Sequence, residues 1–318
     1  MEKNLYGLLI DHLLDHIPKS IKASSFLMDL LGLGRESIYR RIRGEIPFTA
    51  DEIIKIAAAL HVSIDEVIDS NNKGQDKVSY DLSLIEPVAY PQIFQSSLEQ
   101  IYTRLLSRRP KEMVLAVNSF HSAFLTGFDA LFKFSYYQWL CQNSDVQTTQ
   151  SFSGLPVSPE LEKLKEQIHT GFQETDRTEM VLDANVFSNL IKEIEYFHQK
   201  KLINDEEKAL LKEEMSGLVA SCERMAKTGL AGANRLTLFL SVYLPVTSNI
   251  GVMHWDDMCQ SVFRLDTIPH LIISQPHICN LQQTGIDFLK RQSICITQSN
   301  EIMQSEFFEI QRQNVDSL

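Results

Sequence analysis

The feature that most constrains this chain is a close succession of helix starts within its first seventy residues. Residues 49–52 (Thr-Ala-Asp-Glu) and 63–66 (Ser-Ile-Asp-Glu) each place a hydroxyl side chain three residues before a glutamate, which is capping-box spacing. Gly34 marks a third start. Each start lies within an apolar pair at hydrophobic-staple spacing, namely Leu33 with Ile38, Phe48 with Ile53, and Val62 with Val67. Starts this close together predict a series of short helices.

Apolar residues at helical spacing complete the pattern. They predict helices over about 2–16, 24–31 and 35–43, and two more that begin at the capping boxes. Residues 71–77 are polar and are typical of a linker. We therefore expect an all-α five-helix domain over residues 1–70, a linker over 71–77 and a larger domain over 78–318.

The third predicted helix concentrates positive charge. Residues 35–43 contain four arginines and one glutamate, a net charge of +3, and a helical projection turns Ile38 and Ile42 inward. Two short helices joined by a glycine-containing turn form a helix-turn-helix, whose second helix enters the major groove of DNA. Arginine binds guanine edges or phosphates through its forked guanidinium. The candidate DNA contacts are therefore the polar residues of this helix: Arg35, Glu36, Ser37, Tyr39, Arg40, Arg41 and Arg43.

These residues resemble a known family. Residues 31–38 (Leu-Gly-Leu-Gly-Arg-Glu-Ser-Ile), followed by Arg40 and Gly44, resemble the helix-turn-helix of lambda-repressor/Cro-type (XRE) transcriptional regulators. Residues 48–66 resemble that family's fourth and fifth helices, so the resemblance covers about residues 5–70. It implies that the chain binds double-stranded DNA and regulates transcription. In the family, the residues that open the recognition helix touch bases; by position these are Arg35, Glu36 and Ser37, with Tyr39 and Arg40 next.

The sequence departs from the family at one position of this helix. The family usually places an apolar residue three positions after the first isoleucine, where this chain has Arg41, and the apolar residue has moved to Ile42. The shift rotates the anchoring face of the helix. Which arginines meet bases and which meet phosphates therefore stays open.

The overall charge sets a condition on DNA binding. Thirty Lys and Arg against 41 Asp and Glu give the chain a net charge of −11. Residues 1–70 alone hold 8 basic and 11 acidic residues, a net charge of −3. Because neither part is basic overall, DNA binding would depend on the one focused helix, and we expect weak non-specific affinity.

The remainder of the chain predicts helices and strands without βαβ alternation. Helices are expected over 91–107, 121–141, 160–172, 187–201, 205–227, 277–291 and 300–313. Strands are expected over 113–117, 235–243, 250–255 and 258–265, with an ambiguous strand and turn over 178–187. This order predicts an α+β domain with a small antiparallel sheet. The aromatic helix over 121–141 is open to three interpretations: core packing, an apolar ligand pocket, or a seam with a second subunit.

Motifs that indicate catalysis or metal binding are missing from this part. It has no Gly-x-Ser-x-Gly, His-Glu-x-x-His, P-loop or dinucleotide-binding motif. Residues 254–257 (His-Trp-Asp-Asp) lie where a hairpin turn is expected, and His270 and His277 lack a third metal ligand. The five cysteines form no Cys-x-x-Cys pair, and neither a membrane span nor a signal peptide is indicated. We expect a cytoplasmic protein with no cofactor, no metal and no enzymatic activity.

The sequence thus favours a DNA-binding transcriptional regulator that acts as a homodimer. Its larger domain would serve dimerisation, the sensing of an unknown small-molecule or protein signal, or both. Two alternatives stay open: an enzyme whose N-terminal domain only targets it to DNA, and a protein-interaction adaptor.

Overall fold

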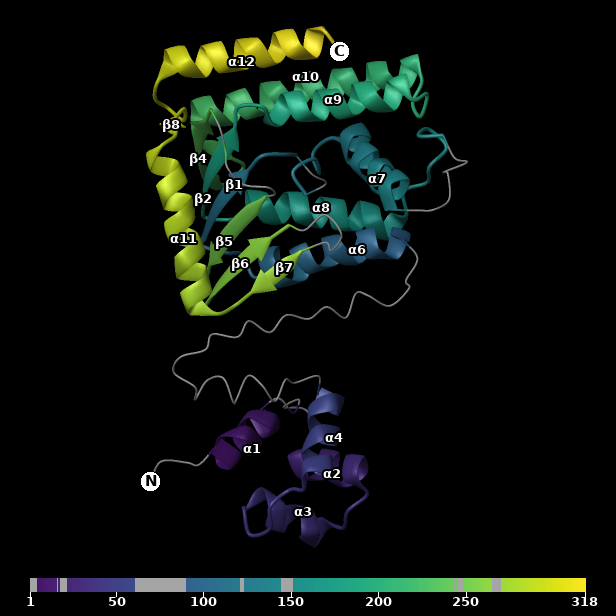
Figure 1. Ribbon diagram of the computed structural model, residues 1–318, viewed down its shortest axis with the longest axis vertical. Coiled ribbons are helices and arrows are strands. Elements are labelled where there is room, and N and C mark those ends of the chain that lie inside the picture. Colours follow the sequence, from purple (N-terminus) through teal and green to yellow (C-terminus); the bar gives the residue numbers. More distant parts are fainter. Residues whose placement is uncertain are drawn as a thin grey trace. The chain divides into compact units, whose positions relative to one another are not determined.

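The structure, a computed structural model, describes residues 5–15, 17, 22–60, 90–120, 123–143, 151–242, 244, 249–264 and 270–318 (Figure 1). The chain divides into two compact units, Met1–Ser79 and Tyr80–Leu318. We call them the N-terminal and the C-terminal unit and describe each by itself. Among the described residues, no helix is long and apolar enough to cross a membrane.

The described part of the N-terminal unit is entirely helical. Its helices are α1 (Leu5–Asp15), α2 (Ala23–Leu31), α3 (Arg35–Ile42) and α4 (Ala50–Leu60). These bounds confirm the first four predicted helices to within about three residues. The predicted fifth helix and its capping box at 63–66 lie outside the described residues. The helices enclose a small core: Ile10, Leu13, Ile17, Leu27, Ile38, Phe48, Ile56 and Ala57.

Local chemistry explains where these helices begin and end. Gly32 ends α2 in the left-handed conformation, with φ of +64°, which favours glycine because it has no Cβ. Gly34 is the N-cap of α3, as predicted. At the start of α4 the Thr49 amide donates to Glu52 (2.9 Å) and the Glu52 amide donates to the Thr49 hydroxyl (3.3 Å). The predicted capping box is therefore confirmed.

The C-terminal unit is built on an eight-stranded sheet. The strands are β1 (Glu112–Val117), β2 (Arg177–Asp183), β3 (Leu230–Ala231), β4 (Asn234–Ser241), β5 (Ile250–His254), β6 (Cys259–Phe263), β7 (Leu271–Ile273) and β8 (Ile294–Cys295). They lie in the order β3-β4-β2-β1-β5-β6-β7, and β8 pairs with β4. β1, β2 and β4 are parallel, whereas the other pairings are antiparallel.

The prediction of a small antiparallel sheet is therefore wrong, because the sheet is large and mixed. The strands predicted at 235–243 and 250–255 follow one another in the sequence, but β2 and β1 lie between them in the sheet. Only the β5–β6–β7 part forms a meander. The parallel crossovers each contain two helices, which hid the βαβ pattern from the sequence. The short strands β3, β7 and β8 were not predicted.

Helices cover both faces of the sheet. They are α6 (Tyr90–Gln100), the π-helical turn η2 (Ile101–Leu106), α7 (Asp129–Asn143), α8 (Pro159–Gln173), α9 (Val186–Gln199), α10 (Asp205–Thr228), α11 (Pro276–Arg291) and α12 (Glu301–Asp316). Helices α6 to α10 lie on one face, α11 lies on the other, and α12 packs on α9 and α10 (Figure 1). β1 shows how the faces divide: Met113, Leu115 and Val117 enter the large core, whereas Val114 and Ala116 face the small core under α11.

The predicted aromatic helix over 121–141 starts later than expected. α7 begins at Asp129, and residues 123–128 form turns; residues 121 and 122 lie outside the described part. Most aromatic side chains of α7 are buried in the large core, including Phe132, Phe134 and Tyr137. Core packing is thus confirmed for the helix itself.

Candidate nucleic-acid interface

The candidate interface is the outer surface of α3, which follows α2 after the Gly32 turn. Ile38 points inward and is fully buried, and Ile42 packs against the same core, so these two residues hold α3 on the unit. Tyr39 also helps to fix α3 on α2: hydrogen bonds with the side chains of Ser24 and Arg35 lower the pKa of its hydroxyl below the usual value. The contact with α2 therefore holds α3 in a fixed orientation, as a helix-turn-helix requires.

The polar side chains of α3 differ strongly in exposure. The side chains of Glu36, Arg43 and Arg40 are 84%, 58% and 48% exposed, whereas that of Arg41 is only 13% exposed. At about 100° per residue these three exposed side chains lie opposite Ile38, which the helical projection turned inward. Arg35 is exposed as well, and its guanidinium lies 5.5 Å from the centre of the Tyr39 ring, a cation–π contact.

Arg41 is bound within the unit. Its Nε and Nη2 donate to the two carboxylate oxygens of Glu52 on α4, both at 3.0 Å, and its Nη1 donates to the Ser37 hydroxyl at 2.8 Å. Burial raises the pKa of Glu52, but hydrogen bonds from Arg41 and Thr49 outweigh burial, so the pKa of this carboxyl lies below its usual value. This pair explains how the helix tolerates an arginine where the resembling family has an apolar residue.

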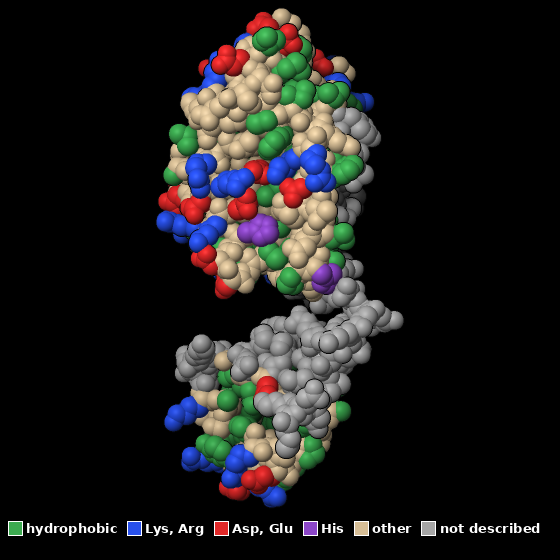
Figure 2. Space-filling model, turned by 90° about the vertical axis from the view of Figure 1, so that its left-hand side faces the viewer, with side chains coloured by type: hydrophobic (Ala, Val, Ile, Leu, Met, Phe, Trp, Pro, Cys, Tyr) green, Lys and Arg blue, Asp and Glu red, His purple; other side chains and the backbone are tan. Residues whose placement is uncertain are grey.

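The exposed arginines have acidic neighbours on the same surface. Arg40 Nε lies 3.4 Å and Arg43 Nε 3.3 Å from carboxylate oxygens of Glu45, and Arg43 also lies 3.9 Å from Glu36. Pairs this exposed are worth at most about 1 kcal/mol, so a DNA phosphate can replace the carboxylate at little cost. Figure 2 shows the result at the end of the unit that α3 occupies, where Lys and Arg side chains gather with Asp and Glu among them.

The sequence did not predict the roles of Glu45 and Glu52. Glu52 was assigned to the capping box alone, and its second role as the partner of Arg41 requires the packing of α3 against α4. Glu45 follows Gly44, whose φ of +75° turns the chain back beside α3. That turn brings Glu45 to both exposed arginines, and a helical projection of residues 35–43 could not show it.

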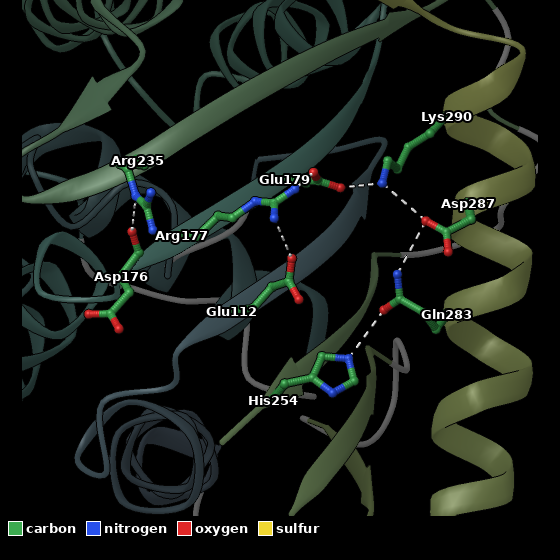
Figure 3. A network of polar contacts seen from close by, with 9 residues as sticks. All are labelled: Glu112, Asp176, Arg177, Glu179, Arg235, His254, Gln283, Asp287 and Lys290. Carbon is green, nitrogen blue, oxygen red and sulfur yellow. Dashed lines mark hydrogen bonds and ion pairs between the residues drawn. The ribbon is translucent and has the colours of Figure 1, made fainter. Parts of the chain in front are cut away.

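Charged groups also meet on the α11 face of the C-terminal sheet (Figure 3). Glu179 on β2 is 7% exposed and contacts both Arg177 and Lys290, and Lys290 in turn contacts Asp287 at 3.0 Å. Arg177 also pairs with Glu112 at 3.5 Å. Figure 2 shows this face as a band of alternating positive and negative side chains. Because the charges neutralise one another and join α11 to the strands, we interpret the network as a structural contact.

The histidines considered in the sequence have ordinary partners. His254 ends β5 before the turn to β6, as the hairpin prediction required, and its Nε2 lies 3.3 Å from the Gln283 side-chain oxygen (Figure 3). His270 Nδ1 lies 3.1 Å from the Ser97 hydroxyl. Within the described part of the chain, no group of three or more His, Cys, Asp or Glu side chains could hold a metal ion.

Comparison with known proteins gives one family match, which covers the N-terminal unit from α1 onward. Residues 8–107 match the family model of the BetR domain, a helix-turn-helix-type DNA-binding domain. No curated protein and no solved structure matches the chain. The match indicates a DNA-binding regulatory role. It begins within α1 and continues through α6 and η2, so it extends beyond the N-terminal unit into the first helices of the C-terminal unit.

Proposed function

We propose that this chain is a sequence-specific transcriptional regulator of the lambda-repressor-like kind, which binds duplex DNA through α3. One observation carries the proposal: α3 exposes Arg35, Arg40 and Arg43 directly after the glycine turn, while Ile38 holds the helix to the core. Arg40 and Arg43 are in position to exchange Glu45 for bases or phosphates. Arg41 and Ser37 act inside the unit, where their mutual hydrogen bond and the Glu52 pair set the orientation of α3.

The proposal includes a homodimer without enzymatic activity. One recognition helix contacts only a few base pairs, and two copies that read half-sites about 34 Å apart multiply the specificity. The C-terminal unit would provide the dimer contact, the sensing of a signal, or both. A signal bound to the C-terminal unit would act by changing the distance between the two DNA-binding units of the dimer.

Selection of DNA sequences from a random duplex pool by the full chain tests the proposal. We expect a selected palindrome or direct repeat, and an Arg40→Ala variant that binds it about 1–3 kcal/mol more weakly if Arg40 contacts a base. If Arg40 contacts a phosphate, binding weakens equally on all sequences and the salt dependence becomes shallower.

Lys55→Ala is the matched control for these measurements. It removes a positive charge of the same unit from α4, where Lys55 is 58% exposed and pairs with Asp51, outside the proposed interface. We expect no change in the selected sequence. A pool that shows no enrichment at low salt would overturn the proposal and favour the protein-interaction adaptor.

A further inference from the structure

The C-terminal unit contains a cavity of about 190 Å³ on the helix-covered face of its sheet. β2 and β4 supply one wall, and helices α8 and α10 supply the others. The segment 123–128, which precedes α7, contributes Phe124 and Phe128 to the lining. Part of the aromatic cluster seen in the sequence therefore lines a cavity, while the aromatic residues of α7 fill the core.

The size of this cavity distinguishes it from ordinary packing defects. Protein interiors contain few voids larger than a water molecule. An engineered cavity of about 150 Å³ with an apolar lining binds benzene, so about 190 Å³ accommodates a six-membered ring with a short side chain. Arg224 and Leu230 in its lining are exposed, so the cavity opens to solvent and a ligand can enter it.

The lining is apolar over most of its area. Phe124, Phe128 and Phe172 contribute aromatic rings, and Met180, Leu218 and Leu238 contribute aliphatic side chains from the sheet and α10. Such a surface favours a ligand whose body is apolar, and the polar side chains in the lining can bind a polar group of that ligand. The ligand must therefore be largely apolar.

The exception is Arg224, the only Lys, Arg, Asp or Glu among the described lining residues. Its Nη2 donates to the neutral hydroxyl of Ser221 at 3.1 Å, and among the described residues its guanidinium pairs with no carboxylate. The neighbouring carboxylate, Glu223, is already held by Lys227 at 2.7 Å and by Arg312 at 2.6 Å. Arg224 is thus a cation with bonding capacity left at the edge of an apolar cavity.

The other polar lining residues are oriented but uncharged. Gln173 Nε2 lies 2.8 Å from His169 Nε2, and His169 Nδ1 lies 3.5 Å from the Thr126 hydroxyl. Burial lowers the pKa of His169 below its usual value, so the ring is neutral at neutral pH. The cavity therefore carries one positive charge.

We propose that this cavity binds a small amphipathic carboxylate, whose apolar body lies among the phenylalanine rings and whose carboxylate pairs with Arg224. Arginine and carboxylate form two parallel hydrogen bonds, which gives this pair strength and geometric specificity. That the acid is the signal of the regulator rests on the proposed function; the binding itself does not.

Matched acids and amides test the carboxylate. The probes are 3-phenylpropionate and octanoate with their primary amides, added to the full chain. Both tryptophans, Trp139 and Trp255, lie in the C-terminal unit, so the thermal transition of tryptophan fluorescence reports on the unit that holds the cavity. A ligand that binds the folded state raises this transition. We expect the acids to raise it and the amides to raise it much less.

Two variants locate the site. Arg224→Gln should weaken the acids about tenfold or more and leave the amides unchanged, because it removes only the charged partner. Lys208→Gln, on the same helix and outside the cavity lining, is the matched control and should change neither. Leu218→Trp fills the cavity and should abolish binding of all four probes. If Leu218→Trp does not fold, Arg224→Gln alone tests the site, because its substitution lies at an exposed position and leaves the core intact.

The outcomes separate the inference from the proposed function. No binding by any probe, equal binding of acids and amides, or full acid binding by Arg224→Gln would each overturn the carboxylate site. Acid binding that leaves the DNA affinity of the full chain unchanged would retain the site and remove its role as a signal. Acid binding by a chain that binds no DNA would retain the site and refute the proposed function.

Discussion

Each unit of this chain contains an ion pair that fixes one helix on its neighbour, but the two pairs rest on different amounts of apolar packing. In the N-terminal unit, Arg41 and Glu52 join α3 to α4 beside a small described core. In the C-terminal unit, Lys290 and Glu179 join α11 to β2, next to a second core under α11 and across the sheet from a much larger one.

The difference shows what each unit can tolerate. The described part of the N-terminal unit buries few apolar side chains, so the loss of one of them removes a large share of its core. The C-terminal unit buries enough apolar side chains to retain a void of about 190 Å³ and a charged network without losing its fold. The small unit thus presents an exposed cationic helix, and the large unit contains a cavity.

The largest expected effect is the unfolding of the N-terminal unit when a side chain of its core is truncated. Ile38→Ala should destabilise this unit by about 2–5 kcal/mol, a large fraction of the stability of a domain of this size. We expect fast hydrogen exchange throughout α1–α4 and no DNA binding, while the tryptophan fluorescence transition of the C-terminal unit stays unchanged. The matched variant Ile194→Ala, also at a fully buried position, should shift only that transition. A joint shift of both units in either variant would show that they do not unfold separately.

A smaller loss of stability is expected when Arg41, the largely buried arginine of α3, is replaced. Arg41→Ala should destabilise the N-terminal unit by about 1.5–3 kcal/mol, because Glu52 keeps its position but loses its charged partner. Hydrogen exchange of the α3 amides measures the change. Lys290→Ala makes the equivalent deletion in the C-terminal unit, and we expect it to leave the large core folded, with loosened exchange confined to α11. Wild-type protection of α3 in Arg41→Ala would show that the ion pair has no structural role.

Acid should destabilise the C-terminal unit at a higher pH than the N-terminal unit, because different groups are protonated in the two units. The lowered pKa of Glu52 means that its contribution is present above the unfolded pKa of about 4.3 and is lost as pH falls through the folded pKa. Burial and the positive charge of Arg264 lower the pKa of His270 to about 3 in the folded chain. The unfolded chain binds a proton at this residue more readily, so the C-terminal unit loses stability as pH falls from about 6.5 toward about 3.

The C-terminal unit should therefore weaken first on acidification. Tryptophan fluorescence against pH measures this unit, and hydrogen exchange in α1–α4 measures the other. His270→Gln should remove the loss between about pH 6.5 and 4.5. If the N-terminal unit weakened first, or His270→Gln left the pH profile unchanged, the assignment to His270 would be wrong.

The smallest expected effect on stability comes from the exposed arginines of α3. Arg43→Ala should change the stability of the N-terminal unit by less than about 0.5 kcal/mol, because its partners Glu36 and Glu45 are themselves exposed. Its DNA affinity should nevertheless fall. Together with Arg41→Ala, this variant separates the residues that hold α3 from those that face DNA. Equal losses of stability in the two variants would contradict the distinction.

The sequence predicted local structure well because local residues determine it. The capping box at Thr49 and the N-cap at Gly34 depend only on neighbouring residues, and each lies where it was predicted. Beyond the N-terminal unit, the helix predicted over 205–227 is confirmed as α10, which begins at a capping box formed by Asn204 and Glu207.

Pairings between distant residues could not be read in this way. The alternation of a strand is the same for a parallel and an antiparallel partner, so nothing in residues 235–243 revealed that β4 pairs with β2. The partners of Arg41 and Arg40 lie across a helix contact and beyond a glycine turn, and the cavity of the C-terminal unit needs Phe124, Arg224 and Leu238 from three separate segments.

The sheet order also affects when each unit can fold during synthesis. β1 pairs with β2, 65 residues later at Glu112 and Arg177, and with β5, 142 residues later at Glu112 and His254. The helices of the N-terminal unit follow one another closely, and such local contacts form in microseconds to milliseconds. Because the ribosome adds about 5–20 residues per second, we expect α1–α4 to be folded while β1 still waits for most of its neighbours. A nascent chain halted before residue 250 would then already carry a complete α3 surface.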